Sequence, residues 1–245
     1  EQQLADPQTT LMILCNPQNP AGNIWDRETL ARIGALCKQY DVIVVSDEIH
    51  CDLTKPGTEY IPFASVDDTC RDISVTCIAP TKTFNLAGLQ TAAVYAENSI
   101  LHHRMWRQLN TDEVAEPNAF AIQATIAAFQ YGEEWLDELR EYVEKNKQYV
   151  TEFLQEKIPL IHPVAGDATY LMWLDCRKIT ESGRQFVKFI RKTSGLYVSG
   201  GNQYGRGGEG FLRVNVATSK LVVEDGMQRL YESVDAWLKE EKISK

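Results

Sequence analysis

The stretch Val42 to His50, with the sequence VIVVSDEIH, decides the fold. Its first four residues are apolar and β-branched, and a continuous run of this kind is typical of a strand buried on both faces of a parallel sheet. Polar residues follow at once, so Ser46, Asp47 and Glu48 come at the carboxyl end of the predicted strand. The stretch therefore predicts an α/β fold with acidic side chains at one edge of its sheet.

Similar apolar runs lie on both sides of this stretch, at Leu11–Cys15 and at Ile73–Ile78. Between the first two runs, Asp26 is a predicted N-cap. It opens a helical pattern of apolar positions at Leu30, Ile33, Leu36, Cys37 and Tyr40. Strand, helix and strand at this spacing predict parallel pairing through right-handed crossovers. A fourth strand is expected over Thr91–Tyr95.

The second half of the chain has a different pattern. An Ala-rich helix is predicted over residues 118–131, and a long amphipathic helix follows over 133–156. Beyond Pro159 and Pro163, strands are expected at 170–174 and 211–216, and helices at 184–192 and 222–238. This order predicts a smaller α+β unit. We therefore expect one domain over residues 1–132, and a linking helix with a small C-terminal domain over 133–245.

Composition excludes several classes of protein. The chain has 245 residues, 44% hydrophobic and 24% charged, which is ordinary for a globular protein. Its formal net charge of -9 argues against a general nucleic-acid binder, because phosphate contacts need Lys and Arg. No apolar run approaches the ~20 residues that span a bilayer. The polar N-terminus predicts no signal peptide.

Six cysteines form no C-x-x-C pair, and several lie within apolar runs. We therefore expect free thiols in a reducing cytoplasm, with neither a disulfide framework nor a zinc site.

Three of the predicted strands end in polar motifs: NPQNPAG at 16–22, SDEIH at 46–50 and APTKTFN at 79–85. Each motif has a structural explanation when taken alone, since Asn-Pro forms turns, Asp caps helices and a loop Lys is usually solvated. Ligands of open α/β sheets bind at the carboxyl ends of strands, however. An amide, a carboxylate and an amine at consecutive strand ends therefore predict a binding site.

These motifs, in this order, resemble those of the pyridoxal-phosphate enzymes with the aspartate aminotransferase fold. The run GEGFLRVN at 208–215 extends the resemblance over nearly the whole chain. The finer match is to the MalY/PatB-like, cystathionine β-lyase branch of that family. It rests on Trp25, DEIHCD at 47–52, APTKTFNLAGLQ at 79–90, GEEWL at 132–136 and YLMWLDCR at 170–177.

The resemblance implies a type I pyridoxal-phosphate-dependent transferase fold. The chain would supply the C-terminal part of the large, mostly parallel-sheet domain and a smaller α+β C-terminal domain. It would then be about the C-terminal three-fifths of a complete enzyme, and the family's enzymes imply a homodimer.

The same resemblance implies roles for single residues. Lys82 would hold pyridoxal phosphate covalently and move protons at the substrate Cα. Asp47 would keep the ring nitrogen protonated. Asn19 would donate to the phenolic oxygen of the cofactor, and His50 is a second candidate donor whose alternative is a purely structural role. Arg213 would bind the substrate α-carboxylate through a bidentate pair.

The expected grip on the phosphate group is weak. Thr81 offers one hydroxyl, but Ala79 and Gln90 stand where many aminotransferases carry Ser and a cation. The family's glycine-rich phosphate loop has no counterpart here, and the glycines at 200–201 and 207–208 do not match it.

Three functions stay open at this point. The leading prediction is a carbon–sulfur β-lyase that acts on cystathionine or cysteine-like amino acids. The second is an aminotransferase, which would use the same residues. The third is a non-catalytic fragment that only packs against or binds a partner.

Overall fold

The computed structural model describes residues 1–243, which divide into two compact units. The first unit contains Glu1–Gln18, Asn23–Leu139 and Asp167–Thr169, and the second contains Asn19–Gly22, Arg140–Gly166 and the chain from Tyr170 onward. The domains expected from the sequence, 1–132 and 133–245, remain a prediction.

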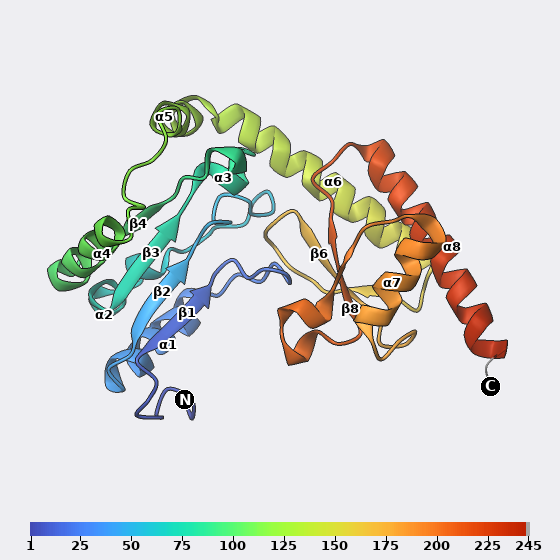
Figure 1. Ribbon diagram of the computed structural model, residues 1–245, viewed down its shortest axis with the longest axis horizontal. Helices are drawn as coiled ribbons and strands as arrows, with labels where there is room; N and C mark the ends of the chain where they lie inside the picture. Colours follow the sequence, from blue (N-terminus) through green and yellow to red (C-terminus); the bar gives the residue numbers. More distant parts are fainter. Residues whose placement is uncertain (244–245) are drawn as a thin grey trace. The chain divides into compact units, whose positions relative to one another are not determined.

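The first unit is built on a four-stranded sheet with the order β1-β2-β3-β4 (Figure 1). The strands are β1 (Leu11–Cys15), β2 (Ile43–Asp47), β3 (Ser74–Ile78) and β4 (Ala93–Tyr95). The first three are parallel, which confirms the pairing predicted from the strand–helix–strand pattern, and β4 joins β3 in the antiparallel direction.

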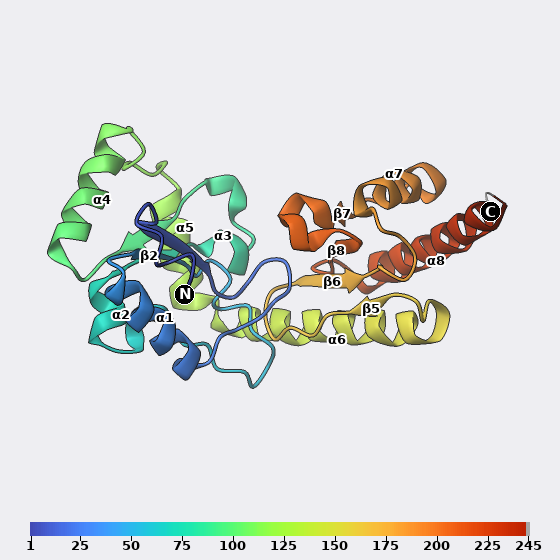
Figure 2. The same ribbon diagram turned by 90° about the horizontal axis from the view of Figure 1, so that it is seen from below.

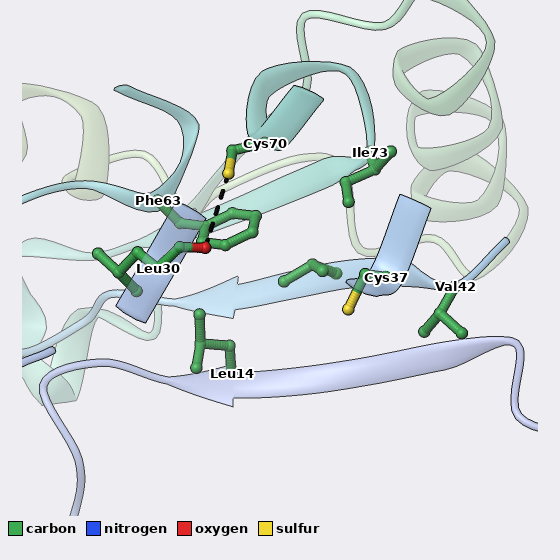
Figure 3. Packing of buried hydrophobic residues seen from close by; sticks show 8 residues of the cluster. Leu14, Leu30, Cys37, Val42, Phe63, Cys70 and Ile73 are labelled. Carbon is green, nitrogen blue, oxygen red and sulfur yellow. Dashed lines mark hydrogen bonds between the residues drawn. The ribbon is translucent and has the colours of Figure 1, made fainter. Parts of the chain in front are cut away.

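One face of this sheet is covered by α1 (Arg27–Gln39) and α2 (Asp68–Asp72). Asp26 caps α1 as predicted, and its carboxylate accepts from the Thr29 amide at 2.7 Å. The core between the helices and the sheet is apolar, and each of its residues is at most 5% exposed (Figure 3). It consists of Leu14, Leu30, Cys37, Val42, Val44, Phe63, Cys70 and Ile73.

The opposite face is only partly covered. Helix α4 (Ser99–Thr111) contributes Leu101, which packs with Val75 of β3. On the edge strand β1, however, Leu11 is 50% exposed and Ile13 is 69% exposed. The expectation that this run is buried on both faces is therefore wrong for β1, because nothing among residues 1–243 covers that side of the strand. Helix α4 was not predicted, although Leu101, Met105 and Leu109 recur at helical spacing.

Short elements complete the first unit. They are η1 (Phe63–Ser65), α3 (Pro80–Thr83), η2 (Ala87–Leu89) and α5 (Ala121–Tyr131). Helix α6 (Glu133–Lys157) begins in this unit and belongs to the second from Arg140.

The second unit has an antiparallel sheet with the order β5-β6-β8-β7 (Figure 2). Its elements are β5 (His162–Pro163), β6 (Leu171–Asp175), α7 (Gly183–Ser194), β7 (Ser199–Gly200), η3 (Gly201–Tyr204), η4 (Arg206–Gly208), β8 (Phe211–Asn215) and α8 (Lys220–Ile243). Asn146 of α6 is buried and donates to the carbonyls of Val216 and Thr218 at 2.9 and 3.0 Å. This amide ties α6 to the segment after β8.

None of the helices within residues 1–243 combines the length and the apolar character that a membrane span requires. The six cysteines are free thiols, of which Cys37, Cys70 and Cys176 are buried.

A buried carboxyl group joins β2 to η1. Glu48 is 2% exposed, and its Oε1 accepts from the Ser46 hydroxyl at 2.8 Å and from the Phe63 amide at 3.1 Å. Burial raises the pKa of Glu48 above its usual value of 4.5, and the nearby charge of Asp47 raises it further, while the hydrogen bonds oppose the shift. Glu48 therefore fixes the segment that follows Asp47.

This raised pKa makes stability depend on pH. The folded chain keeps the Glu48 proton to a higher pH than the unfolded chain, so the stabilisation is complete below pH 4.5 and declines as the pH rises through the folded pKa. We expect Glu48→Gln to become more stable relative to the parent as the pH rises above 4.5. Urea unfolding across this pH range measures the difference in the free energy of unfolding. Glu59→Gln is the control for loss of an exposed charge. A parallel pH profile for the parent and Glu48→Gln would contradict the shift.

A glycine in α1 makes close packing against α2 possible. A Cβ on Gly34 would lie 2.4 Å from the sulfur of Cys70, which is fully buried. We expect Gly34→Ala to lower the free energy of unfolding by about 1–2 kcal/mol, since overpacking outweighs the gain in helix propensity. Gly88→Ala is the control, because nothing lies within 4 Å of its added Cβ. Adding Cys70→Ala to Gly34→Ala should cost less than the sum of the single changes, and full additivity would exclude the clash.

Candidate functional site

The carboxyl ends of β1, β2 and β3 lie side by side at one edge of the first sheet. Cys15, Asp47 and Cys77 are successive Cα partners across the three strands. Partners in a parallel sheet point to the same face. Asp47 is therefore flanked on its own face by two thiols, and the charge of Asp47 together with burial raises the pKa of Cys77.

Asp47 is half-buried at the end of β2. Its Oδ1 accepts from the Ile49 amide at 3.4 Å, a long contact. No basic side chain in the described part of the chain forms an ion pair with it. The carboxylate can therefore accept a cationic partner from a bound molecule.

Lys82 and Thr81 lie in α3, the single helical turn that follows β3, and both are half-buried. Pro80 occupies the first turn of this helix, where its missing N–H costs nothing. Across residues 1–243, no carboxylate pairs with the Lys82 ammonium group. The amine therefore emerges from the same sheet edge as Asp47 without a protein counter-charge.

Two anchors hold α3, and the sequence revealed neither. The buried Thr83 hydroxyl donates to Asp52 Oδ2 at 3.0 Å, which ties the residue after Lys82 to the segment after Asp47. On the other side, Phe84 packs edge-on against Phe129 with ring centroids 5.4 Å apart, and against Trp135 at 6.0 Å. Because a four-residue helix has little stability of its own, these contacts decide where Lys82 lies.

His50 and Asn16 are two further buried polar residues of this edge. His50 is 3% exposed. Asn16 is fully buried, and its Oδ1 accepts from the Trp25 amide at 3.2 Å, whereas its Nδ2 has no hydrogen-bond partner. A buried amide nitrogen without a partner is costly, so Asn16 is a polar feature of this edge that the sequence did not single out.

The second unit brings together Asn19 and Arg213, which are 194 residues apart in the sequence. The Arg213 Nη1 donates to Asn19 Oδ1 at 3.1 Å. The guanidinium carbon also lies 4.9 Å above the centre of the Tyr204 ring. Arg213 is half-buried on β8 and pairs with no carboxylate of the described residues. Its charge is therefore not neutralised by another side chain of the described residues.

The structure thus gathers Asp47, His50, Thr81 and Lys82 at one edge of the first sheet, and Asn19 with Arg213 in the second unit. Tyr204 and the pair Asp52–Thr83 were not foreseen. The only signal for the latter pair was their place in the motifs at 47–52 and 79–90.

Comparison with known proteins found relatives that match almost the whole chain. PatB of Bacillus subtilis, a cystathionine beta-lyase, is 43% identical over 230 residues, which cover 94% of this chain and 59% of PatB. Protein MalY of Escherichia coli is 32% identical, with 95% of this chain and 59% of MalY covered. The pyridoxal-phosphate-bound C–S lyase of Staphylococcus hominis has a TM-score of 0.86 at 32% identity, covering 95% of this chain and 60% of that one.

The chain therefore spans about three-fifths of the length of these relatives. A family model described as aminotransferase class I and II matches residues 1–230. Since this match covers almost all of the chain and the fold agrees with solved structures of that type, the chain belongs to the class I and II aminotransferase family.

Proposed function

We propose that this chain makes up about three-fifths of a pyridoxal-phosphate-dependent carbon–sulfur β-lyase that acts on cystathionine or related sulfur amino acids. The observation that carries the choice of reaction is the 43% identity with the cystathionine beta-lyase PatB. The bound cofactor of the Staphylococcus hominis C–S lyase supports the choice of cofactor.

The residues at the first sheet edge fit pyridoxal phosphate by the chemistry of their side chains. Asp47 offers a carboxylate for a protonated ring nitrogen, and Lys82 offers an amine for the aldehyde carbon. Neither is neutralised by another side chain of the described residues, and the buried Asn16 Nδ2 adds an unused donor. When bound, the cofactor supplies a ring that withdraws electrons from the substrate Cα.

Lys82 has two tasks in this proposal. Its Nζ holds the cofactor until a substrate amine replaces it, and the released amine then takes the proton from Cα. The Cβ–S bond would then break, the sulfur would take up a proton and leave as a thiol, and water would convert the remaining three-carbon amino fragment to pyruvate and ammonia. Asp52 acts through Thr83, because their hydrogen bond holds the helix that carries Lys82.

Arg213 binds the α-carboxylate of the substrate by two parallel N–H···O bonds. This contact orients the Cα–H and Cβ–S bonds for cleavage. Asn19 accepts from Arg213 through Oδ1, so the opposite end of its amide, Nδ2, is the donor we assign to the phenolic oxygen of the cofactor. His50 is the second candidate for that oxygen, against a structural role that its burial also fits.

The phosphate group receives one hydroxyl from this chain, that of Thr81. We propose that the remaining two-fifths of the enzyme, judged from the length of the relatives, supplies the glycine-rich phosphate loop. The isolated chain is then expected to bind the cofactor poorly.

We also propose that the complete enzyme is a cytoplasmic homodimer. Six free thiols fit a reducing compartment. Helix α5 carries a stripe of exposed apolar side chains, with Ile122, Ile126 and Phe129 each between 45% and 53% exposed. An exposed apolar stripe of this kind is typical of a surface that is covered by another part of the enzyme or by a second copy.

Lys82 is expected to be the residue that holds the cofactor. Borohydride reduction of the loaded complete enzyme makes the bond between the cofactor and its lysine permanent, and peptide mapping then locates the label. We expect the label on Lys82 and its loss in Lys82→Ala, with Lys55→Ala as a control that keeps it. Label on a different lysine would overturn the assignment.

The reaction is expected to be elimination rather than amino transfer. With cystathionine, the complete enzyme should form pyruvate and a thiol faster than it transfers the amino group of any common amino acid to a keto acid. A coupled dehydrogenase assay measures pyruvate, and a thiol reagent measures the second product. Amino transfer without pyruvate would move the protein to the aminotransferase function.

The pyruvate assay on the 245-residue chain tests the third function, that of a non-catalytic fragment. We expect little activity, because its grip on the phosphate is incomplete. Full activity would show that the chain needs no further segment, whereas inactivity of the complete enzyme in both assays would favour a non-catalytic role.

A further inference from the structure

The glycine-rich segment from Gly200 to Gly210 has no task in the proposed function. It leaves β7, where Ser199 is the Cα partner of Arg213, and returns through η3 and η4 to β8. On its other side Arg213 faces Trp173 of β6. The segment therefore begins and ends beside the arginine that is proposed to bind the substrate carboxylate.

Two glycines let this segment close on itself. A Cβ on Gly201 would lie 2.1 Å from the Gly208 carbonyl oxygen and 2.7 Å from the Trp173 ring, and one on Gly208 would lie 2.0 Å from the Gly201 carbonyl oxygen. Neither position has the space for a side chain. Glycine is required at both positions because two backbone segments approach each other closely over the Trp173 indole ring.

The closed segment places Tyr204 against Arg213. The guanidinium carbon lies 4.9 Å above the centre of the Tyr204 ring, within the range of a cation–π contact. Tyr204 in turn meets Trp173 edge-on at 5.7 Å, and Trp173 stacks on Phe211 at 5.1 Å. Trp173 is 8% exposed, so the tyrosine rests on a rigid, buried support.

We propose that Tyr204 is a positioning residue for Arg213, and that Gly201 and Gly208 serve to hold Tyr204 in place. The segment 200–210 would thereby set the affinity for the α-carboxylate of the substrate. This inference rests on the proposed function of Arg213 as the carboxylate-binding residue.

The chemistry follows from the shape of the guanidinium group. The guanidinium carbon lies over the Tyr204 ring, and Asn19 accepts from one of the N–H donors. These two contacts restrict where the guanidinium group lies and how it rotates. A guanidinium held in this way loses less conformational entropy when a carboxylate binds.

The first test is the chemical reactivity of Arg213 in the complete enzyme before cofactor is added. Phenylglyoxal modifies arginines, and peptide mapping gives the rate at each site, with the exposed Arg206 of the same segment as internal standard. We expect Tyr204→Leu to raise the Arg213 rate by about 3- to 10-fold relative to Arg206, whereas Tyr204→Phe, which keeps the ring, restores the parent rate. Equal rates in Tyr204→Leu and the parent would overturn the proposal.

The second test is the division between KM and kcat for cystathionine in the complete enzyme. Loss of the ring should raise KM by about 3- to 10-fold and change kcat by less than about twofold, because the lost contact stabilises bound substrate and transition state alike. Gly201→Ala should have the same effect. Gly207→Ala is its matched control and leaves KM unchanged, since nothing lies within 4 Å of the added Cβ.

Arg213→Gln separates failure of this inference from failure of the proposed function. If Arg213→Gln abolishes saturation by cystathionine and Tyr204→Leu leaves KM unchanged, Arg213 binds substrate without help from Tyr204 and only the inference is wrong. If Arg213→Gln also leaves KM unchanged, the proposed role of Arg213 is wrong. A Gly201→Ala protein that does not fold leaves the decision to Tyr204→Leu, whose reactivity and KM are both measured against Tyr204→Phe.

Discussion

The register of three parallel strands is the constraint on which the candidate site depends. Cys15, Asp47 and Cys77 stand at the same level, so the turns after β1, β2 and β3 begin at one edge. A slip of one residue in β2 would turn Asp47 toward the face that α1 covers. The hydrogen bond from the Phe63 amide to Glu48 opposes that slip, because a shifted carboxyl group would lose a buried partner on another segment.

The parts of the fold that the sequence predicted correctly have local causes. An apolar run bounded by polar residues indicates a strand wherever it occurs, and Asp26 caps α1 through its own neighbour Thr29. The exposure of one face of β1 does not depend on local sequence in this way. Whether Leu11 and Ile13 are covered depends on which chain segment reaches them, and periodicity carries no information about that partner.

The candidate site divides in the same way. Asp47 and Lys82 could be chosen from their motifs, because Asp47 ends β2 and Lys82 lies in the helical turn after β3. The contacts that orient them could not be chosen, since Thr83 meets Asp52 across 31 residues and Arg213 meets Asn19 across 194. Such pairs form only when the chain folds, and no periodic pattern in the sequence predicts them. The glycines at 201 and 208 were visible, but their use depends on a backbone contact and an indole ring.

Two arginines of the second unit differ in whether an acidic side chain neutralises their charge. Arg177 and Arg213 each lie 4.9 Å above an aromatic ring, those of Phe211 and Tyr204. Arg177 is neutralised by Asp175, with contacts of 2.9 and 2.6 Å, and this pairing holds the pKa of the Asp175 carboxyl below its usual range. Arg213 instead meets the neutral amide of Asn19. An amide orients a guanidinium without cancelling its charge, so an incoming carboxylate has no internal ion pair to displace.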